Sequence, residues 1–281
     1  MDINLDARPS PIAGRWYPGD ARQLAESVDE YMKVAELPEI IGEVMAVIAP
    51  HAGHRYSGPV AGYAFAAVRG IQPDLVAVVS PMHHPYAQPL LTSAHMAYQT
   101  PLGQIMIDQE AIEALNTELD QALGFELTPI RNDQEHSLEI ELPFLQRALE
   151  NEFHLLPVMV RDQSSRVGQA LGESIAKILR EKNALLVASS DLSHFYSQAR
   201  ANELDGEMLR QVEAFDPLGV LRTEEQGKGF ACGRIAIAAV LWAARDLGAN
   251  TVQILNYATS GDVTGDHQEV VGYAAAVITS V

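Results

Sequence analysis

Histidine-containing segments follow three apolar runs of the sequence, and neutral imidazole is the commonest transition-metal ligand in proteins. Two imidazoles and one anionic side chain can bind a divalent metal and leave coordination positions open for a substrate. The chain has nine histidines, and five lie in these segments: His51 and His54 after run 44–49, His83 and His84 after run 75–79, and His194 after run 184–188. The sequence therefore predicts a metal site that includes histidines from these segments.

The third ligand is not fixed by the spacing of the residues. The candidates are Cys232, Asp191, Glu135 and Asp205. Cys232 lies at the start of a predicted helix, and a helix N-terminus or a metal lowers the pKa of a thiol. Either effect would favour the thiolate form, which binds metals.

The apolar runs before these histidines are typical of buried strands. Helical patterns alternate with them, which predicts an α/β fold with a largely buried, mostly parallel sheet that becomes mixed near its end. Ligands of such sheets bind beyond the carboxyl ends of the strands. The three histidine motifs should converge if their strands are parallel neighbours. The predicted strands are 44–49, 75–79, 103–108, 153–160, 184–188, 251–257 and 270–279; the predicted helices are 21–34, 58–69, 109–119, 137–150, 165–182, 198–215 and 233–247.

Composition limits the partners and the cellular compartment that we expect for this protein. The net charge is −18, and the 19 Lys and Arg residues are scattered, so nucleic acid and membrane surfaces are not expected partners. A single cysteine excludes an intramolecular disulfide and fits a reducing compartment. The first residues show no signal-peptide pattern, so we expect a cytoplasmic protein. No linker or repeat divides the chain, which predicts one domain over residues 1–281.

A further polar motif opens the predicted helix 137–150. His136 could point into the pocket and contact a substrate. The alternative is structural, with Asp133 or Ser137 as a helix cap and with Glu139 and Glu141 in solvent.

These motifs, in this order, resemble the Memo family, whose microbial members are called AmmeMemoRadiSam system protein B. The resemblance covers nearly the whole chain. It is carried by segments 13–18 (AGRWYP), 49–53 (APHAG), 56–58 (YSG), 80–84 (SPMHH), 100–103 (TPLG), 135–139 (EHSLE), 189–194 (SSDLSH), 232–234 (CGR) and 259–262 (TSGD).

The resemblance implies a fold like that of class III extradiol ring-cleaving dioxygenases, which hold Fe(II) with two His and one Glu. It places His51 and His83 as the imidazole ligands and Cys232 where those enzymes have their Glu. His194 would be the acid/base group, and Asp191 would orient the site. The thiolate makes this site softer than the dioxygenase site and favours sulfur-bound Fe, Cu or Zn.

The resemblance also suggests the residues around a substrate. His136 would touch it as a catalytic or binding group, and Trp16 and Tyr56 would line the pocket. Fe(II) is the metal that it favours, with Cu or Zn as alternatives.

Three functions fit these expectations. The first is a non-haem metal enzyme with redox or oxygenase-type activity on a small molecule. The second is a metal-binding or redox-control protein that converts no organic substrate. The third is a module that binds a peptide or partner in the same cleft. The microbial family name implies a link to a radical S-adenosylmethionine enzyme, whereas the charge of −18 argues against phosphopeptide binding. Thiol catalysis by Cys232 with His194 as base is weaker, because no oxyanion-hole motif surrounds the cysteine.

Overall fold

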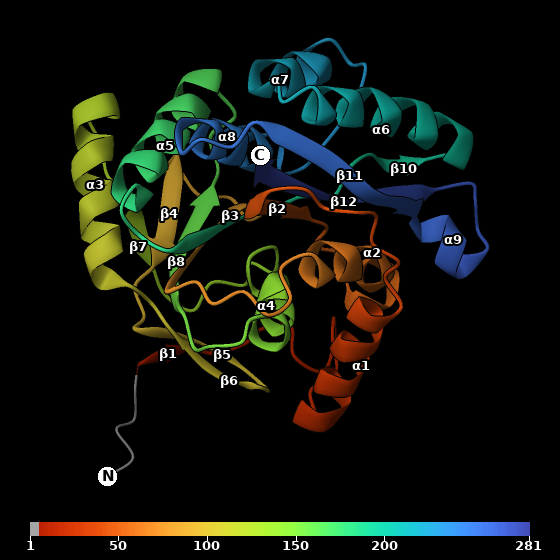
Figure 1. Cartoon of the computed structure of the whole chain (residues 1–281), viewed down its shortest axis with the longest axis horizontal. Helices are drawn as coiled ribbons and strands as arrows, with labels where there is room; N and C mark the ends of the chain where they lie inside the picture. Colours follow the sequence, from red (N-terminus) through yellow and green to blue (C-terminus); the bar gives the residue numbers. More distant parts are fainter. Residues whose placement is uncertain (1–5) are drawn as a thin grey trace.

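A nine-stranded mixed sheet forms the centre of the computed structural model, which describes residues 6–281 (Figure 1). Its strands are β2 (Glu43–Ala49), β3 (Leu75–Pro81), β4 (Leu90–Ser93), β7 (Thr128–Ile130), β8 (His154–Val160), β9 (Ala184–Ser189), β10 (His194–Tyr196), β11 (Thr251–Thr259) and β12 (Val270–Ser280). The order is β10-β12-β2-β9-β3-β8-β4-β7, and β11 also pairs with β12. A separate three-stranded sheet contains β1 (Ala7–Arg8), β5 (Ala97–Thr100) and β6 (Gly103–Met106).

Helices cover both faces of the large sheet. They are α1 (Ala21–Lys33), α2 (His54–Ala66), α3 (Gln109–Leu123), α4 (Leu142–Ala148), α5 (Ser165–Leu179), α6 (Gln198–Glu213), α7 (Pro217–Glu225), α8 (Arg234–Asp246) and α9 (Ser260–Thr264), with a 3₁₀ turn η1 at Glu139–Glu141. In Figure 1, α3, α5 and α8 gather on one side, and α1, α2 and α4 gather on the other. Within the described residues, no helix is long and apolar enough to cross a membrane.

The three strands that precede the histidine motifs are parallel neighbours. β9 lies between β2 and β3, with Ala49 opposite Ser189 and Val79 opposite Ala188. Every residue of β3 is buried, as expected for a strand covered on both faces. β12 and β4 run antiparallel to β2 and β8, which makes the sheet mixed. The predicted α/β class and the parallel arrangement of these three strands are therefore confirmed.

Local signals explain several helix ends. Asp20 caps α1 by accepting a hydrogen bond of 2.9 Å from the backbone N–H of Gln23, as the sequence indicates. The helix predicted to reach residue 215 ends at Glu213, and Phe215 has a φ of +54°. That left-handed backbone is unfavourable for continuing the helix.

One predicted helix is divided in the structure, and one helix of the structure was not predicted. The segment 137–150 is not one helix bent at Pro143. A 3₁₀ turn comes first, and Pro143 lies in the first turn of α4, where proline is favourable because no N–H is needed. Helix α7 was not predicted, although Asp216 caps it and Pro217 opens it.

Helices α5 and α8 approach closely at Gly172, where a Cβ atom would meet the carbonyl oxygen of Ala239 at 2.5 Å. We expect Gly172→Ala to lower the free energy of unfolding by about 1–3 kcal/mol because backbone cannot yield cheaply to the new atom. Gly206→Ala is the matched control: it lies inside α6 with open space around it. Helix propensity alone should make that variant more stable by about 0.5–1 kcal/mol. Urea unfolding measures both, and equal effects of the two variants would contradict this account of the contact.

Burial of His54, the first residue of α2, predicts a pH dependence of stability. Burial lowers its pKa to about 4, even though its Nε2 lies 3.1 Å from the carbonyl oxygen of Ile140, which favours the charged form. The unfolded side chain has a pKa of about 6.5, so the unfolded state binds the proton more tightly. The stability contributed by neutral His54 is therefore complete above that value and falls as the pH drops toward 4.

We expect His54→Gln to reduce the loss of stability on acidification. Between about pH 7.5 and about pH 5, wild type should lose about 2 kcal/mol more unfolding free energy than the variant does. Urea unfolding at both pH values measures the difference. Equal losses of unfolding free energy in the two proteins would show that His54 is not the group that titrates.

Candidate metal centre

Three imidazoles converge beyond the carboxyl ends of the central strands. His51, His83 and His136 each offer a ring nitrogen, and these three atoms all lie within 4.8 Å of one another. The rings of His83 and His136 stack with centroids 4.8 Å apart, and His51 meets both of them edge-on. His51 is buried, whereas His83 is exposed and gives the cluster an opening to solvent.

The fold explains this convergence. His51 directly follows β2, and His83 comes two residues after β3. Because β9 lies between two parallel neighbours, both histidines leave the same edge of the sheet. His136 comes from the segment between β7 and η1. The structure thus brings together two of the predicted ligands, with His136, predicted as a substrate contact, as the third member of the group.

Each ring is held through its Nδ1 atom. The Nδ1 of His83 lies 2.9 Å from a carboxylate oxygen of Glu135, and that of His136 lies 3.2 Å from the same oxygen. The Nδ1 of His51 lies 2.9 Å from the hydroxyl of Ser189. Such contacts fix the tautomer and the ring orientation of metal-bound histidines. They leave Nε2 of each ring as the atom able to bind a metal.

Glu135, one of the four candidate third ligands, acts here as a support. Its carboxylate accepts hydrogen bonds from the backbone N–H groups of His83, His136 and Ser137 at 2.6–3.0 Å. Burial alone would raise its pKa, but hydrogen bonding and the charge of His83 outweigh burial and hold the pKa well below its usual range. The carboxylate is therefore ionised and able to orient both rings.

Cys232 adjoins the cluster through His51, with its Sγ 3.0 Å from His51 Nε2. The expected lowering of its thiol pKa by a helix N-terminus is outweighed, although a backbone hydrogen bond at Gly233 acts in that direction. Helix α8 begins at Arg234 after Gly233, and burial together with the charge of Asp191 raises the pKa of the thiol well above its usual value. Without a metal, the thiol is protonated and can donate to His51.

Asp191 holds the backbone at the end of β2. Its carboxylate accepts hydrogen bonds from the N–H groups of His51 at 2.7 Å and Ala52 at 3.3 Å. Burial raises its pKa to about 7, and the two backbone hydrogen bonds oppose that shift. Asp205, another candidate ligand, instead accepts from the backbone N–H of Ser193 at 2.9 Å and lies outside the group of close donor atoms.

The segment that carries His136 is anchored by a buried arginine. Arg8 forms two hydrogen bonds with the carboxylate of Asp133, at 2.7 and 2.9 Å, and one of 2.5 Å with Glu139. It also donates to the backbone carbonyl of Glu135 at 2.7 Å. Asp133 therefore does not cap a helix, and the alternative that Glu139 is solvated was wrong.

A second buried network supports His51. Glu141, also expected in solvent as an alternative, is fully buried, and burial raises its pKa well above the usual value. Its carboxyl lies 2.6 Å from the hydroxyl of Ser189, which in turn lies 2.6 Å from the carbonyl oxygen of Ser137. The Ser189 oxygen can accept one hydrogen bond from protonated Glu141 and another from the Nδ1–H of His51. The Ser189 hydroxyl can then donate its proton to the carbonyl oxygen of Ser137. Ser137 is likewise not a cap, because its hydroxyl donates to the carbonyl of Pro81.

The remaining predicted residues surround the cluster. The Nδ1–H of His194 donates to the carbonyl of Leu192 at 2.8 Å, and His194 shares the lining of a 230 Å³ cavity with Cys232. The ring of Trp16 lies 4.1 Å from that of His136, and Tyr56 is exposed in the first turn of α2.

Burial keeps three imidazoles in and beside the site neutral. Burial lowers the pKa of His136 to about 4, with the charge of Glu135 opposing the shift. Burial also lowers the pKa values of His51 and His194. Neutral imidazole is the form that binds metals, so three of the histidines are available for binding or proton transfer at neutral pH.

Similarity to known proteins identifies the family of the chain. The family model described as Memo-like protein matches residues 8–277. The chain belongs to the Memo family. Its relatives include a MEMO1 family protein from Nitrosopumilus maritimus, 32% identical over 95% of this chain and 98% of its own length. Another, from Methanococcoides burtonii, is 33% identical over 96% of this chain and 99% of its own length. The structure of an uncharacterized Escherichia coli K12 protein matches with a TM-score of 0.47 at 14% identity, covering 85% of this chain and all of that one.

Several supporting residues of this Memo-family site were not found from the sequence. Arg8 and Ser189 hold ligand-bearing segments, but the sequence assigned neither of them a role. Ser189 directly follows the predicted strand 184–188, and that position was a usable signal for its place at the site. Arg8 lies 125 residues from its partner Asp133, so only the tertiary fold pairs them.

We expect Glu135→Gln to weaken metal binding by about 10–100-fold, the usual cost of losing such an outer contact. Gln keeps one acceptor but removes the charge that orients His83 and His136. Competition with a chromophoric chelator for Zn²⁺ measures the affinity. Glu113→Gln is the control, because Glu113 is exposed on α3. Equal affinities in wild type and Glu135→Gln would show that the carboxylate does not support the ligands.

Proposed function

We propose that this Memo-family protein binds a divalent transition metal at the histidine cluster and uses it in redox or oxygenase-type chemistry on a small substrate. The observation that carries the proposal is the close approach of ring nitrogens from His51, His83 and His136, each ring with its Nδ1 already engaged. The structure leaves Nε2 of each ring as the candidate donor. Fe(II) is the metal that we propose, with Cu or Zn as alternatives.

The third ligand is the point on which metal identity depends. His136 would complete a three-imidazole face with open positions, which suits non-haem Fe(II) as well as Zn. Cys232 would make the site softer and favour Cu(I) or Zn. Tetrahedral ligands with bonds of about 2.1 Å to nitrogen and about 2.3 Å to sulfur are about 3.6 Å apart. His51 Nε2 and Cys232 Sγ are hydrogen-bonded at 3.0 Å, so this pair would have to separate by about half an ångström to bind one tetrahedral ion.

The chain's own residues can supply the remaining chemistry. A bound metal would act as a Lewis acid or redox centre with open coordination positions. His194 is the proposed acid/base group, because its Nδ1–H is committed to Leu192 and its Nε2 remains free to accept or give a proton. Asp191 fixes the backbone of His51, and Trp16 and Tyr56 are the proposed walls of the substrate site.

A second function is favoured by the thiol beside His51. A thiolate next to a redox metal can itself be oxidised, which suits a metal-binding or redox-control protein that converts no organic substrate. Substitution of His194 separates the two functions. If the protein is an enzyme, His194→Ala should lose turnover and keep its metal. If it is a metal-control protein, His194→Ala should bind the metal as wild type does. A peptide-binding or partner-binding module, including one linked to a radical S-adenosylmethionine enzyme, should bind its partner without metal.

Metal content tests the proposal directly. Protein purified without oxygen and without a metal-affinity tag should contain close to one Fe, Cu or Zn ion per chain by mass spectrometry. His51→Ala should remove it, because that variant loses the ring shared by both ligand sets. Failure of the wild type to bind any of the three metals, even after reconstitution, would refute the proposal.

Proton release identifies the third ligand. A thiol must lose its proton to bind a metal, whereas neutral imidazole need not. If Cys232 is a ligand, wild type should release about one proton more per Zn²⁺ than Cys232→Ser, measured by calorimetry in buffers of different ionisation enthalpy. Equal proton release, with a lower affinity in His136→Ala, would assign the third position to His136 instead.

A further inference from the structure

A cavity of 230 Å³ opens beside Cys232, next to the histidine cluster. Cys232 is partly exposed and lines this cavity together with His194. Its Sγ lies 3.0 Å from Nε2 of His51, so the cavity leads to the immediate neighbour of a proposed metal ligand. Sites for drug-sized ligands measure about 300–1,000 Å³, whereas about 150 Å³ is enough for one benzene molecule. The size of this cavity therefore suits a small molecule.

Two aromatic rings from different parts of the chain line this cavity. Tyr196 belongs to β10, and Phe230 lies in the connection between α7 and α8. The two rings stack with their centroids 5.9 Å apart. Leu192 and Ala231 add apolar side chains to the same lining. A molecule that enters here passes between mostly apolar groups before it reaches Cys232.

The backbone of β10 holds two of the lining residues in place. Phe195, between His194 and Tyr196, has a φ of +63°, and the pairing of β10 with β12 is irregular at this point. A left-handed backbone is unfavourable for a bulky residue and persists where the surrounding structure fixes it. His194 and Tyr196 both line the cavity, whereas Phe195 is 70% exposed and does not. The irregular strand thus fixes His194 and Tyr196 along one passage.

The charged and polar groups of the lining are already engaged. Among the residues that the structure describes, the carboxylate in this lining is that of Glu224, and both of its oxygens have partners. One forms an ion pair with Arg234, and the other accepts a hydrogen bond of 3.1 Å from the backbone N–H of Ala231. The Nδ1–H of His194 donates to the carbonyl of Leu192. An ion that entered the cavity would find no free opposite charge, and burial of an unpaired charge is costly.

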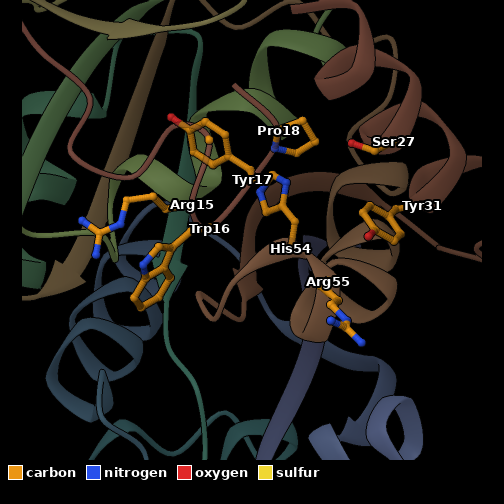
Figure 2. A pocket seen from close by; sticks show the side chains of 9 residues that line it. Arg15, Trp16, Tyr17, Pro18, Ser27, Tyr31, His54 and Arg55 are labelled. Carbon is orange, nitrogen blue, oxygen red and sulfur yellow. The ribbon is translucent and has the colours of Figure 1, made fainter. Parts of the chain in front are cut away.

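The cavity in Figure 2 approaches the cluster at a different residue. It has a volume of 350 Å³ and is lined by Trp16, His54 and Arg55, among others. The ring of Trp16 lies 4.1 Å from that of His136. Cys232 does not belong to this lining. The two cavities therefore border the cluster separately, one beside His136 and the other beside Cys232.

We infer that the cavity beside Cys232 is a separate entrance to the proposed metal centre, selective for small uncharged molecules, and that Tyr196 and Phe230 set this selectivity. Apolar walls without a free charge favour an uncharged molecule over an ion of similar size. Delivery of such a molecule to a bound metal rests on the proposed function. Entry as far as Cys232 does not, because it requires only the cavity and its lining.

Modification of Cys232 measures this entry, because the chain has no other cysteine. In chelator-treated protein, the thiol loses its proton to solvent and the thiolate attacks methyl methanethiosulfonate, which forms a mixed disulfide and releases methanesulfinate. Each rate is divided by the rate of urea-unfolded protein. The uncharged methyl reagent should react at least about tenfold faster than the anionic 2-sulfonatoethyl and cationic 2-(trimethylammonio)ethyl reagents, because their charges find no partner in the cavity. All reagents meet the same thiol, so its ionisation does not affect this ratio.

Two substitutions test the aromatic lining in opposite directions. Phe230→Trp places a larger ring in the cavity and should slow the methyl reagent by at least about tenfold, because entry then requires displacement of packed side chains. Tyr196→Ala opens the lining to water, so a charged reagent can enter with part of its hydration. This variant should lose most of the preference for the uncharged reagent, and it keeps the test informative if Phe230→Trp does not fold.

Arg55→Trp is the matched control. It places the same large ring on an exposed residue of the cavity in Figure 2 and should react as wild type does. The inference would be overturned if wild type reacted alike with all three reagents or with none. Wild-type rates in both Phe230→Trp and Tyr196→Ala, or equal slowing in Arg55→Trp and Phe230→Trp, would also overturn it.

Metal binding by the same samples separates this inference from the proposed function. If the charge selectivity depends on Tyr196 and Phe230 but the protein binds no Fe, Cu or Zn, the entrance stands and the metal function fails. If the protein binds metal and Cys232 of the chelated protein reacts alike with all three reagents, the metal centre stands and the selective entrance fails.

Discussion

Parallel pairing of β2, β9 and β3 is the constraint on which the site depends. Strands in a parallel sheet all end at one edge, so residues that are distant in sequence leave the sheet side by side. The register places Ile48, Ala188 and Val79 at equivalent heights, and the histidine motifs follow within a few residues of each. Strands β12 and β4 run antiparallel to β2 and β8, outside the three strands that carry the histidine motifs. They therefore do not alter the edge at which those three strands end.

Buried polar networks convert this rough convergence into defined ring orientations. The carboxylate of Glu135 contacts the imidazoles of His83 and His136 and accepts hydrogen bonds from three backbone N–H groups. It therefore connects the segment after β3 with the segment before η1. Arg8 then joins that segment to the N-terminal strand through Asp133 and Glu139. Such a buried network is costly unless every charge finds a partner, and breaking one partner leaves the others unpaired.

The electrostatics of the site combine neutral bases with raised acid pKa values. Burial keeps His51 and His136 unprotonated, and it raises the pKa values of Asp191, Glu141 and Cys232. A divalent cation would reverse part of this balance, since its charge favours the thiolate and the carboxylate forms.

The sequence by itself determined the α/β class, most strands and helices, and the histidine motifs at three strand ends. These follow from short-range patterns: continuous apolar runs, helical periodicity, and capping residues such as Asp20. It did not determine that η1 precedes α4, because a 3₁₀ turn and a helix start share the same local pattern. Only the tertiary structure decided that β9 lies between β2 and β3, that His136 joins the cluster, and that burial leaves Cys232 protonated. These outcomes depend on contacts between residues more than 100 positions apart, such as Arg8 with Asp133, and on burial that no local window of sequence encodes.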